Sequence, residues 1–230
     1  MRRNFACNIL RQDMKKKKLV WFYVIFFAVV LVSYLAFVFI NEGGWRAKPV
    51  VLNNVKPFTF TTQDGQPFTR QELIGKVTVV EYFFTNCHGI CPHLNTNMKG
   101  IYNDFRDEPD FQIVSHTCDP DRDTVARIKA YADSLKVDER QWIFLTGRKD
   151  SLYNAARESY LLDDPKNGLR NINDQFMHTQ FFAVVDKNGM VRGQIFDGLK
   201  KSEIAELEEL VRVLLKEKVG PPNTNFLLNK

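Results

Sequence analysis

Two cysteines, Cys87 and Cys91, lie four residues apart in the stretch FFTNCHGICPHLNTNM, which spans residues 83–98. A thiol acts as a nucleophile or a metal ligand once it is ionised, and a helix N-terminus favours the ionised form. Two thiols at this spacing can form a local disulfide, exchange electrons with another thiol pair, or hold one metal ion. The residue types alone leave all three roles open.

Loop size, cysteine spacing and the ligand preferences of metals favour these roles to different degrees. A structural disulfide here would close so small a loop that its entropic stabilisation would be modest. Thiol oxidoreductases commonly use C-x-x-C, whereas this pair has one more residue between the sulfurs. A closed zinc site needs four ligands, and the sequence has no second paired motif. Two thiolates with one imidazole suit copper, because soft sulfur selects Cu(I) and imidazole also tolerates Cu(II).

The neighbouring segments predict how the cysteines are positioned. The run KVTVVEYFF (76–84) is almost continuously β-branched or aromatic, which is typical of a strand buried on both faces. A helix is predicted after the cysteines, because apolar residues recur there at helical spacing. They are Leu94, Met98, Ile101, Tyr102 and Phe105. The pair therefore sits at a strand-to-helix junction, where ligands bind in α/β sheets, and a helical turn would place both thiols on one face.

The rest of the sequence after residue 56 predicts alternating strands and helices. Strands are expected at 111–119 and 141–147, with hairpins turning at Asp64-Gly65 and Asn188-Gly189. Helices are expected after a cap at Asp123, at about 149–158, and from Ser202 onward. Residues 159–177 lack clean periodicity and predict a long loop. This order predicts an α/β fold with a thioredoxin-like mixed β-sheet flanked by helices.

Residues 19–40 form one uncharged, apolar run that is long enough to cross a hydrocarbon core as a helix, about 33 Å. The run has no A-x-A cleavage pattern, which favours an anchor over a cleaved signal peptide. We therefore divide the chain into a basic cytoplasmic tail (1–18), a transmembrane anchor (19–40), a tether (41–56) and a thioredoxin-like domain (57–230) that carries the cysteine pair.

The charge distribution predicts topology and excludes one partner class. Residues 1–18 carry seven Lys or Arg and one Asp, so the rest of the chain has a net charge of about −1. The basic residues thus predict an N-terminus in the cytoplasm and a periplasmic C-terminal domain on a single-pass protein of the inner membrane. No basic surface for nucleic acid is expected in the exported region.

Three segments resemble the SCO/SenC family of membrane-anchored copper chaperones. FFTNCHGICP resembles its F-T-x-C-x-x-x-C-P motif, DPDRDT (119–124) its D-P-x-R-D-T stretch, and FMHTQFFAVVDKNG its segment with a distal histidine ligand. Their order and spacing match along nearly the whole exported domain. The resemblance implies a thioredoxin-like fold in which Cys87, Cys91 and His178 bind one copper, with Asp119 in a supporting role.

The same resemblance implies a role in assembling the binuclear copper site of cytochrome c oxidase. The implied partners are the copper-bearing oxidase subunit, another copper chaperone and a thioredoxin-like reductant. A competing hypothesis is a thiol–disulfide reductase that keeps the oxidase cysteines reduced, which needs Cys87 and Cys91 but not His178. No acid–base constellation beyond the thiols is present, so the protein is not expected to be an enzyme unless it is this reductase.

Cys118, the third cysteine after the apolar run, and the other three histidines have simpler interpretations. Cys118 precedes Asp119, where a free cysteine serves as a small buried hydrophobe, although a third redox thiol is the alternative. His88, between the two cysteines, is expected to face solvent or to offer an alternative ligand. His93 is expected at the surface where the helix begins, and His116 is expected to be buried in a strand.

Overall fold

The structure, a computed structural model, describes residues 2–40, 49–87, 89–166, 171 and 179–220. The chain divides into two compact units, Met1–Lys48 and Pro49–Lys230. The first unit contains one helix, α1 (Arg2–Ile40), and its segment Lys17–Phe37 is long and apolar enough to cross a membrane. Its apolar side chains from Leu19 to Phe37 are exposed.

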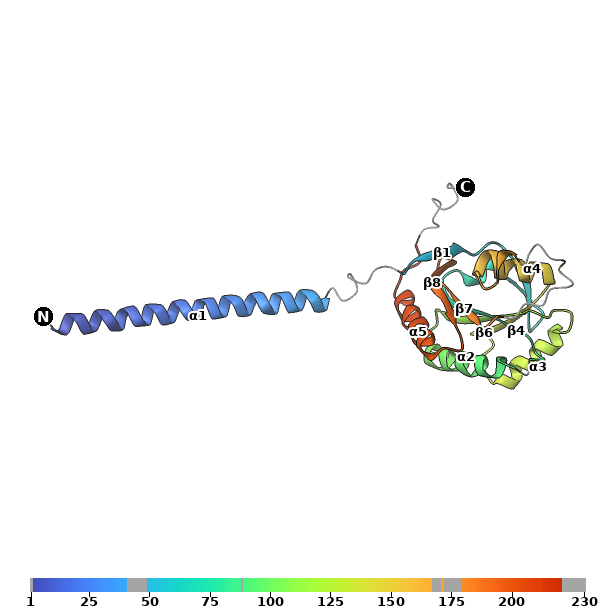
Figure 1. Ribbon diagram of the computed structural model, residues 1–230, viewed down its shortest axis with the longest axis horizontal. Helices are drawn as coiled ribbons and strands as arrows, with labels where there is room; N and C mark the ends of the chain where they lie inside the picture. Colours follow the sequence, from blue (N-terminus) through green and yellow to red (C-terminus); the bar gives the residue numbers. More distant parts are fainter. Residues whose placement is uncertain (1, 41–48, 88, 167–170, 172–178, 221–230) are drawn as a thin grey trace, which may run out of the picture. The chain divides into compact units, whose positions relative to one another are not determined.

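The second unit is built on one eight-stranded sheet (Figure 1). Its strands are β1 (Val51–Asn54), β2 (Thr59–Thr62), β3 (Pro67–Thr69), β4 (Val77–Phe83), β5 (Phe111–Thr117), β6 (Trp142–Thr146), β7 (Phe181–Val185) and β8 (Met190–Asp197). Their spatial order is β1-β8-β7-β4-β5-β6-β2-β3. The three strands β4, β5 and β6 are parallel, whereas β7 runs antiparallel to β4. The predicted mixed sheet is present, with β4 buried at every position.

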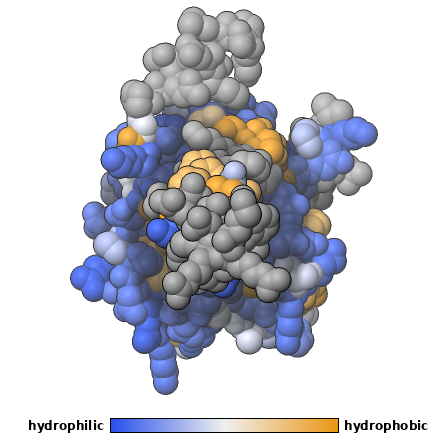
Figure 2. Space-filling model, turned by 90° about the vertical axis from the view of Figure 1, so that its left-hand side faces the viewer, coloured by the Kyte–Doolittle hydropathy of each residue, from blue (hydrophilic) through white to orange (hydrophobic). Residues whose placement is uncertain are grey.

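Helices cover both faces of this sheet (Figure 1). They are η1 (Arg70–Leu73), α2 (Cys91–Phe105), α3 (Val125–Leu135), α4 (Lys149–Asn154), the π-helical η2 (Ala155–Tyr160) and α5 (Lys201–Leu215). Alternate residues of β4 enter two hydrophobic clusters, because successive side chains of a strand point to opposite faces. Val79 and Phe83 pack with α2, α3 and α5, whereas Val80 and Tyr82 pack with η1, α4 and η2. In Figure 2 most of the described residues in view are hydrophilic.

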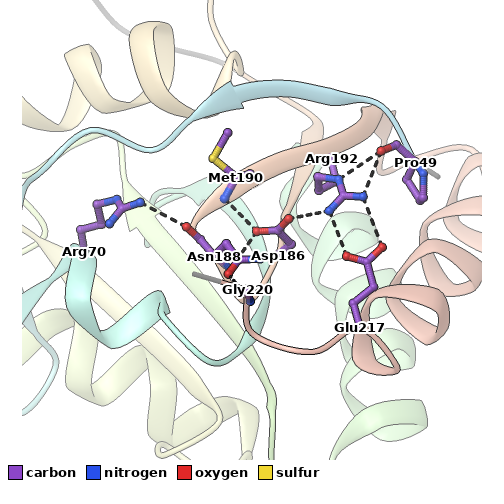
Figure 3. Close-up of polar contacts among 8 residues, drawn as sticks. All are labelled: Pro49, Arg70, Asp186, Asn188, Met190, Arg192, Glu217 and Gly220. Carbon is purple, nitrogen blue, oxygen red and sulfur yellow. Dashed lines mark hydrogen bonds and ion pairs between the residues drawn. The ribbon is translucent and has the colours of Figure 1, made fainter. Parts of the chain in front are cut away.

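A polar network closes the end of the sheet at the β7–β8 hairpin (Figure 3). Asp186 accepts hydrogen bonds from the backbone N–H of Met190 at 3.0 Å and from Arg192 Nη1 at 2.5 Å. Arg192 also donates to the carbonyl of Pro49 and to the carboxylate of Glu217. One buried guanidinium thereby joins Pro49, before β1, and Glu217, after α5, to the β7–β8 hairpin.

Three predicted boundaries need correction. The segment predicted as a tether (41–56) contains β1, which pairs with β8, and Val55, which is fully buried, so the folded unit begins earlier than residue 57. The helical region that begins at Lys149 continues through η2 to Tyr160. The last helix begins at Lys201, one residue before Ser202. A short edge strand has little hydrophobic periodicity, and for this reason the sequence pattern did not predict β1.

Candidate metal centre

Cys87 and Cys91 lie at the junction between β4 and α2. Cys91 is the first residue of α2, and Pro92 occupies its first turn, where proline lacks only an N–H that would be unpaired anyway. Among its first residues α2 has no acidic side chain and no side-chain cap. The N-terminal end of its dipole is therefore available to stabilise a thiolate.

The structure joins Cys87 and Cys91 in a disulfide, with their Cα atoms 5.9 Å apart. Cys87 lies in the loop before the helix, so loop geometry rather than a helical turn brings the sulfurs together, contrary to the sequence expectation. Cys91 is 8% exposed, whereas Cys87 is partly exposed. Cys87 is thus the more accessible sulfur for an incoming thiolate.

Asp123 was predicted to cap α3, and this is wrong. The cap position is Thr124, which makes no capping hydrogen bond with its side chain. Asp123 is instead buried and accepts hydrogen bonds from Thr85 and Thr117. The carboxylate thus faces the cysteine loop, which the D-x-x-x-D pattern of residues 119–123 could not reveal.

Asp119 lies beside this arrangement and is partly exposed. Its carboxylate is 3.8 Å from Arg122 Nη1, and its backbone N–H donates to Thr117 Oγ1 at 3.0 Å. Its carbonyl accepts from the N–H groups of Arg122 and Asp123. Asp119 therefore shapes the turn after β5, and its supporting role at the metal remains a prediction.

Cys118 is buried and belongs to no disulfide. Its thiol donates to the carbonyl of Phe83 at 3.2 Å, and it packs in the cluster on the face of α4 and η2. Burial, together with the carboxylate of Asp123, raises the pKa of the thiol to about 12. A thiol in this state is a poor nucleophile and a poor metal ligand, which favours its reading as a small buried hydrophobe.

The histidines are distributed over different environments. His93 is exposed on the first turn of α2, and His116 is completely buried in β5. The predicted ligand His178 and the neighbouring His88 lie outside the described residues. Within the part that is described, no group of three His, Cys, Asp or Glu side chains is placed to hold a metal ion.

The sheet topology nevertheless bears on His178. Because β7 is antiparallel to β4, with Val80 opposite Ala183, the beginning of β7 at Phe181 lies at the end of the sheet where β4 finishes. β7, the strand that follows the predicted ligand His178 in the sequence, therefore begins at the cysteine end of the sheet.

Sequence reasoning missed two polar residues near this end. Thr85 connects the cysteine loop to Asp123, and Glu81 is a buried carboxylate in β4 that accepts a hydrogen bond from Ser115. The sequence signal for Glu81 was a single charged residue within the apolar run 76–84. Because a charged side chain is almost never fully buried without a partner, it indicated a buried polar contact in this strand.

Comparison with known proteins identifies relatives of this chain. The model of the SCO1/SenC family matches residues 49–213. The SCO1 protein homolog of Bacillus subtilis is 31% identical over 166 residues, which cover 70% of this chain and 83% of that protein. The residues matched by the family model include the whole sheet and both cysteines.

Solved structures share the fold. BsSco, described as a member of the Sco family of cytochrome c oxidase assembly proteins with a disulfide switch, has a TM-score of 0.62 and 27% identity and covers 75% of this chain and 98% of its own. Yeast Sco1 with copper bound has a TM-score of 0.53 and 24% identity, covering 70% and 94%, a likeness that shows the fold. The predicted thioredoxin-like fold class is confirmed. Since the family model spans most of the chain, this protein belongs to the SCO1/SenC family.

Proposed function

We propose that this protein is a membrane-anchored copper chaperone that binds one copper through Cys87, Cys91 and His178 and delivers it to the binuclear copper site of cytochrome c oxidase. The observation that carries the proposal is the convergence of the cysteine pair and the start of β7 at one end of the sheet. Membership in a family whose members include an oxidase assembly protein and a copper-bound yeast protein supports it.

The donor set suits copper in both oxidation states. Two thiolates favour Cu(I), and an imidazole accommodates Cu(II) as well. The partly exposed Cys87 is accessible to the ligands of a partner, whereas the buried Cys91 is held on α2. Copper can therefore leave by stepwise exchange onto thiols of the oxidase subunit, with another copper chaperone as its supplier.

Copper binding is tested on the reduced full chain in detergent micelles. We expect one copper per chain, and His178→Ala should weaken Cu(I) affinity by about 100-fold or more. Loss of a direct ligand should cost more than loss of a group that only orients a ligand, which typically weakens binding by about 10- to 100-fold. His93→Ala, which removes an exposed histidine from the first turn of α2, is the matched control and should leave the Cu(I) affinity unchanged. Equal binding by wild type and His178→Ala would remove His178 from the site.

A thiol–disulfide reductase is the second candidate, and the Cys87–Cys91 disulfide favours it. In that reaction the Cys87 thiolate attacks a disulfide of the oxidase subunit, and Cys91 then resolves the mixed disulfide. Two electrons pass to the partner, whose cysteines become thiols, and the Cys87–Cys91 disulfide forms. A thioredoxin-like reductant would return the two electrons. Rapid reduction of a disulfide-bonded partner peptide by a chain that binds no copper would favour this function.

The proposal places α1 across the inner membrane with residues 1–18 in the cytoplasm and the second unit in the periplasm. A membrane-impermeant maleimide, added with a reductant to intact spheroplasts, should therefore label Cys87. Cys118 should react only after unfolding, because its thiol is buried and its pKa is raised. Labelling of Cys87 only after permeabilisation would reverse the orientation, and labelling of native Cys118 would revive its role as a third redox thiol.

A further inference from the structure

We infer that Asp123 is a positioning residue for the copper site, acting on the cysteine loop through Thr85. The inference rests on the proposed function, because it concerns the same pair of cysteines. Asp123 is 1% exposed, and both of its carboxylate oxygens accept hydrogen bonds. It therefore acts on the sulfurs through its neighbours.

Thr85 links Asp123 to the cysteine loop through two hydrogen bonds. Its backbone N–H donates to Asp123 Oδ2 at 3.2 Å, and its hydroxyl donates to Asp123 Oδ1 at 2.5 Å. The same hydroxyl accepts from Arg127 Nε at 2.7 Å. With both its donor and acceptor functions engaged, the Thr85 side chain has one defined orientation.

Three elements meet at the carboxylate. Thr117, the last residue of β5, donates its hydroxyl to Asp123 Oδ2 at 2.6 Å. Arg127, in the first turn of α3, lies 3.9 Å from Asp123 Oδ1. Thr85, two residues before Cys87, is thus held by hydrogen bonds and an ion pair at the end of β5 and the beginning of α3.

These hydrogen bonds to Asp123 matter because Cys87 lies in a loop, outside any helix or strand. The backbone N–H of Cys87 donates only within its own loop, to the carbonyl of Phe84 at 3.3 Å. Charge-assisted hydrogen bonds to a buried carboxylate are stronger than neutral ones. The hydrogen bonds to Asp123 fix the position of Thr85. The segment from Thr85 to Cys87 in turn places Cys87 opposite Cys91. Supporting groups of this kind typically change metal affinity by about 10- to 100-fold when they are removed.

The test compares the full chain in detergent micelles with Asp123→Asn, Thr85→Val and Asp186→Asn. Asp186 is a matched control, because it is also buried, also accepts backbone N–H hydrogen bonds and also pairs with an arginine, but lies at the β7–β8 hairpin. Thr85→Val keeps the shape of the side chain and the backbone N–H bond, so it tests the loop even if Asp123→Asn does not fold.

Two readouts report on the cysteines. The first is Cu(I) affinity of the reduced chain, measured by competition. The second is the equilibrium with dithiothreitol, in which the Cys87–Cys91 disulfide gains two electrons and two protons as dithiothreitol becomes its cyclic disulfide. A change in this equilibrium constant is not produced by a destabilising substitution remote from the cysteines.

We expect Asp123→Asn to weaken Cu(I) by about 10- to 100-fold and to shift the dithiothreitol equilibrium toward the reduced thiols, with a smaller effect in the same direction for Thr85→Val. Asp186→Asn should change both by no more than about twofold, despite lowering stability. Unchanged readouts in Thr85→Val and Asp123→Asn, or tighter copper in Asp123→Asn, would overturn the inference. Wild-type protein that binds no copper would instead refute the proposed function, while the dithiothreitol equilibrium would still test Asp123.

Discussion

Arg192→Ala is expected to lower the free energy of unfolding by about 3–5 kcal/mol, because it removes one partner of a buried ion pair. The guanidinium is 7% exposed and the Asp186 carboxylate is 4% exposed. With Arg192 gone, the Asp186 charge would stay buried with only backbone N–H groups to compensate it. The contacts to Pro49 and Glu217 would be lost together (Figure 3).

The measurement is urea unfolding of the full chain in detergent micelles, followed by near-ultraviolet circular dichroism. Arg140→Ala is the control, because Arg140 pairs with Asp138 at 2.7 Å but is 89% exposed. Exposed pairs contribute at most about 1 kcal/mol. Arg192→Lys retains the charge without the planar fork and should lie between the two. A loss with Arg192→Ala no larger than with Arg140→Ala would show that the network does not stabilise the fold.

Glu81→Gln is expected to stabilise the protein at pH 8 by about 3 kcal/mol and to leave its stability at pH 4 unchanged. Glu81 is buried on β4, and burial raises the pKa of its carboxyl from 4.5 to about 7, although a hydrogen bond from Ser115 lowers it in part. The folded state therefore holds the proton more tightly than the unfolded chain. Its stability falls as the pH rises from about 4.5 to about 7. Glutamine has no charge to bury and keeps an oxygen for Ser115.

His116 gives the opposite dependence. It is completely buried against the rings of Phe60, Tyr82 and Tyr160, and burial lowers the pKa of its imidazole from 6.5 to about 3. The unfolded chain takes up this proton first, so stability is lost as the pH falls from about 6.5 toward 3. Between about pH 4.5 and 6.5 the effects of Glu81 and His116 oppose each other.

Urea unfolding between pH 4 and 8 separates the two residues. In the wild type, stability should vary little between about pH 4.5 and 6.5. Glu81→Gln removes the dependence that opposes that of His116, so stability should rise with pH through that range. Glu206→Gln, at an exposed glutamate of α5, should follow the wild type. Parallel curves for Glu81→Gln and wild type would refute the assignment of the pH dependence to Glu81.

Local patterns predicted the elements around the site because each pattern reports burial directly. The β-branched run at 76–84 became β4, since a strand covered on both faces needs apolar residues at nearly every position. The helical spacing of Leu94, Met98 and Ile101 became the buried face of α2. The cysteine pair was located at their junction for the same reason.

Polar residues were predicted less well, because their roles depend on distant partners. Asp123 is a good helix cap by local rules, yet its carboxylate binds Thr85, 38 positions away. Arg192 in β8 has the Pro49 carbonyl as a partner, 143 positions away. No spacing rule covers such pairs, because the sheet order β1-β8-β7-β4-β5 that brings these segments together forms only in the folded unit.

By itself, the sequence determined the apolar helix, the mixed sheet between helices, the position of Cys87 and Cys91 and the family to which the chain belongs. Only the tertiary structure decided that β1 forms one edge of the sheet, that Cys118 belongs to no disulfide, and that Asp123 reaches the cysteine loop through Thr85. The physical reason is that hydrophobic periodicity is a local property of the chain. The partner of a buried polar group is chosen by packing between segments far apart in the sequence.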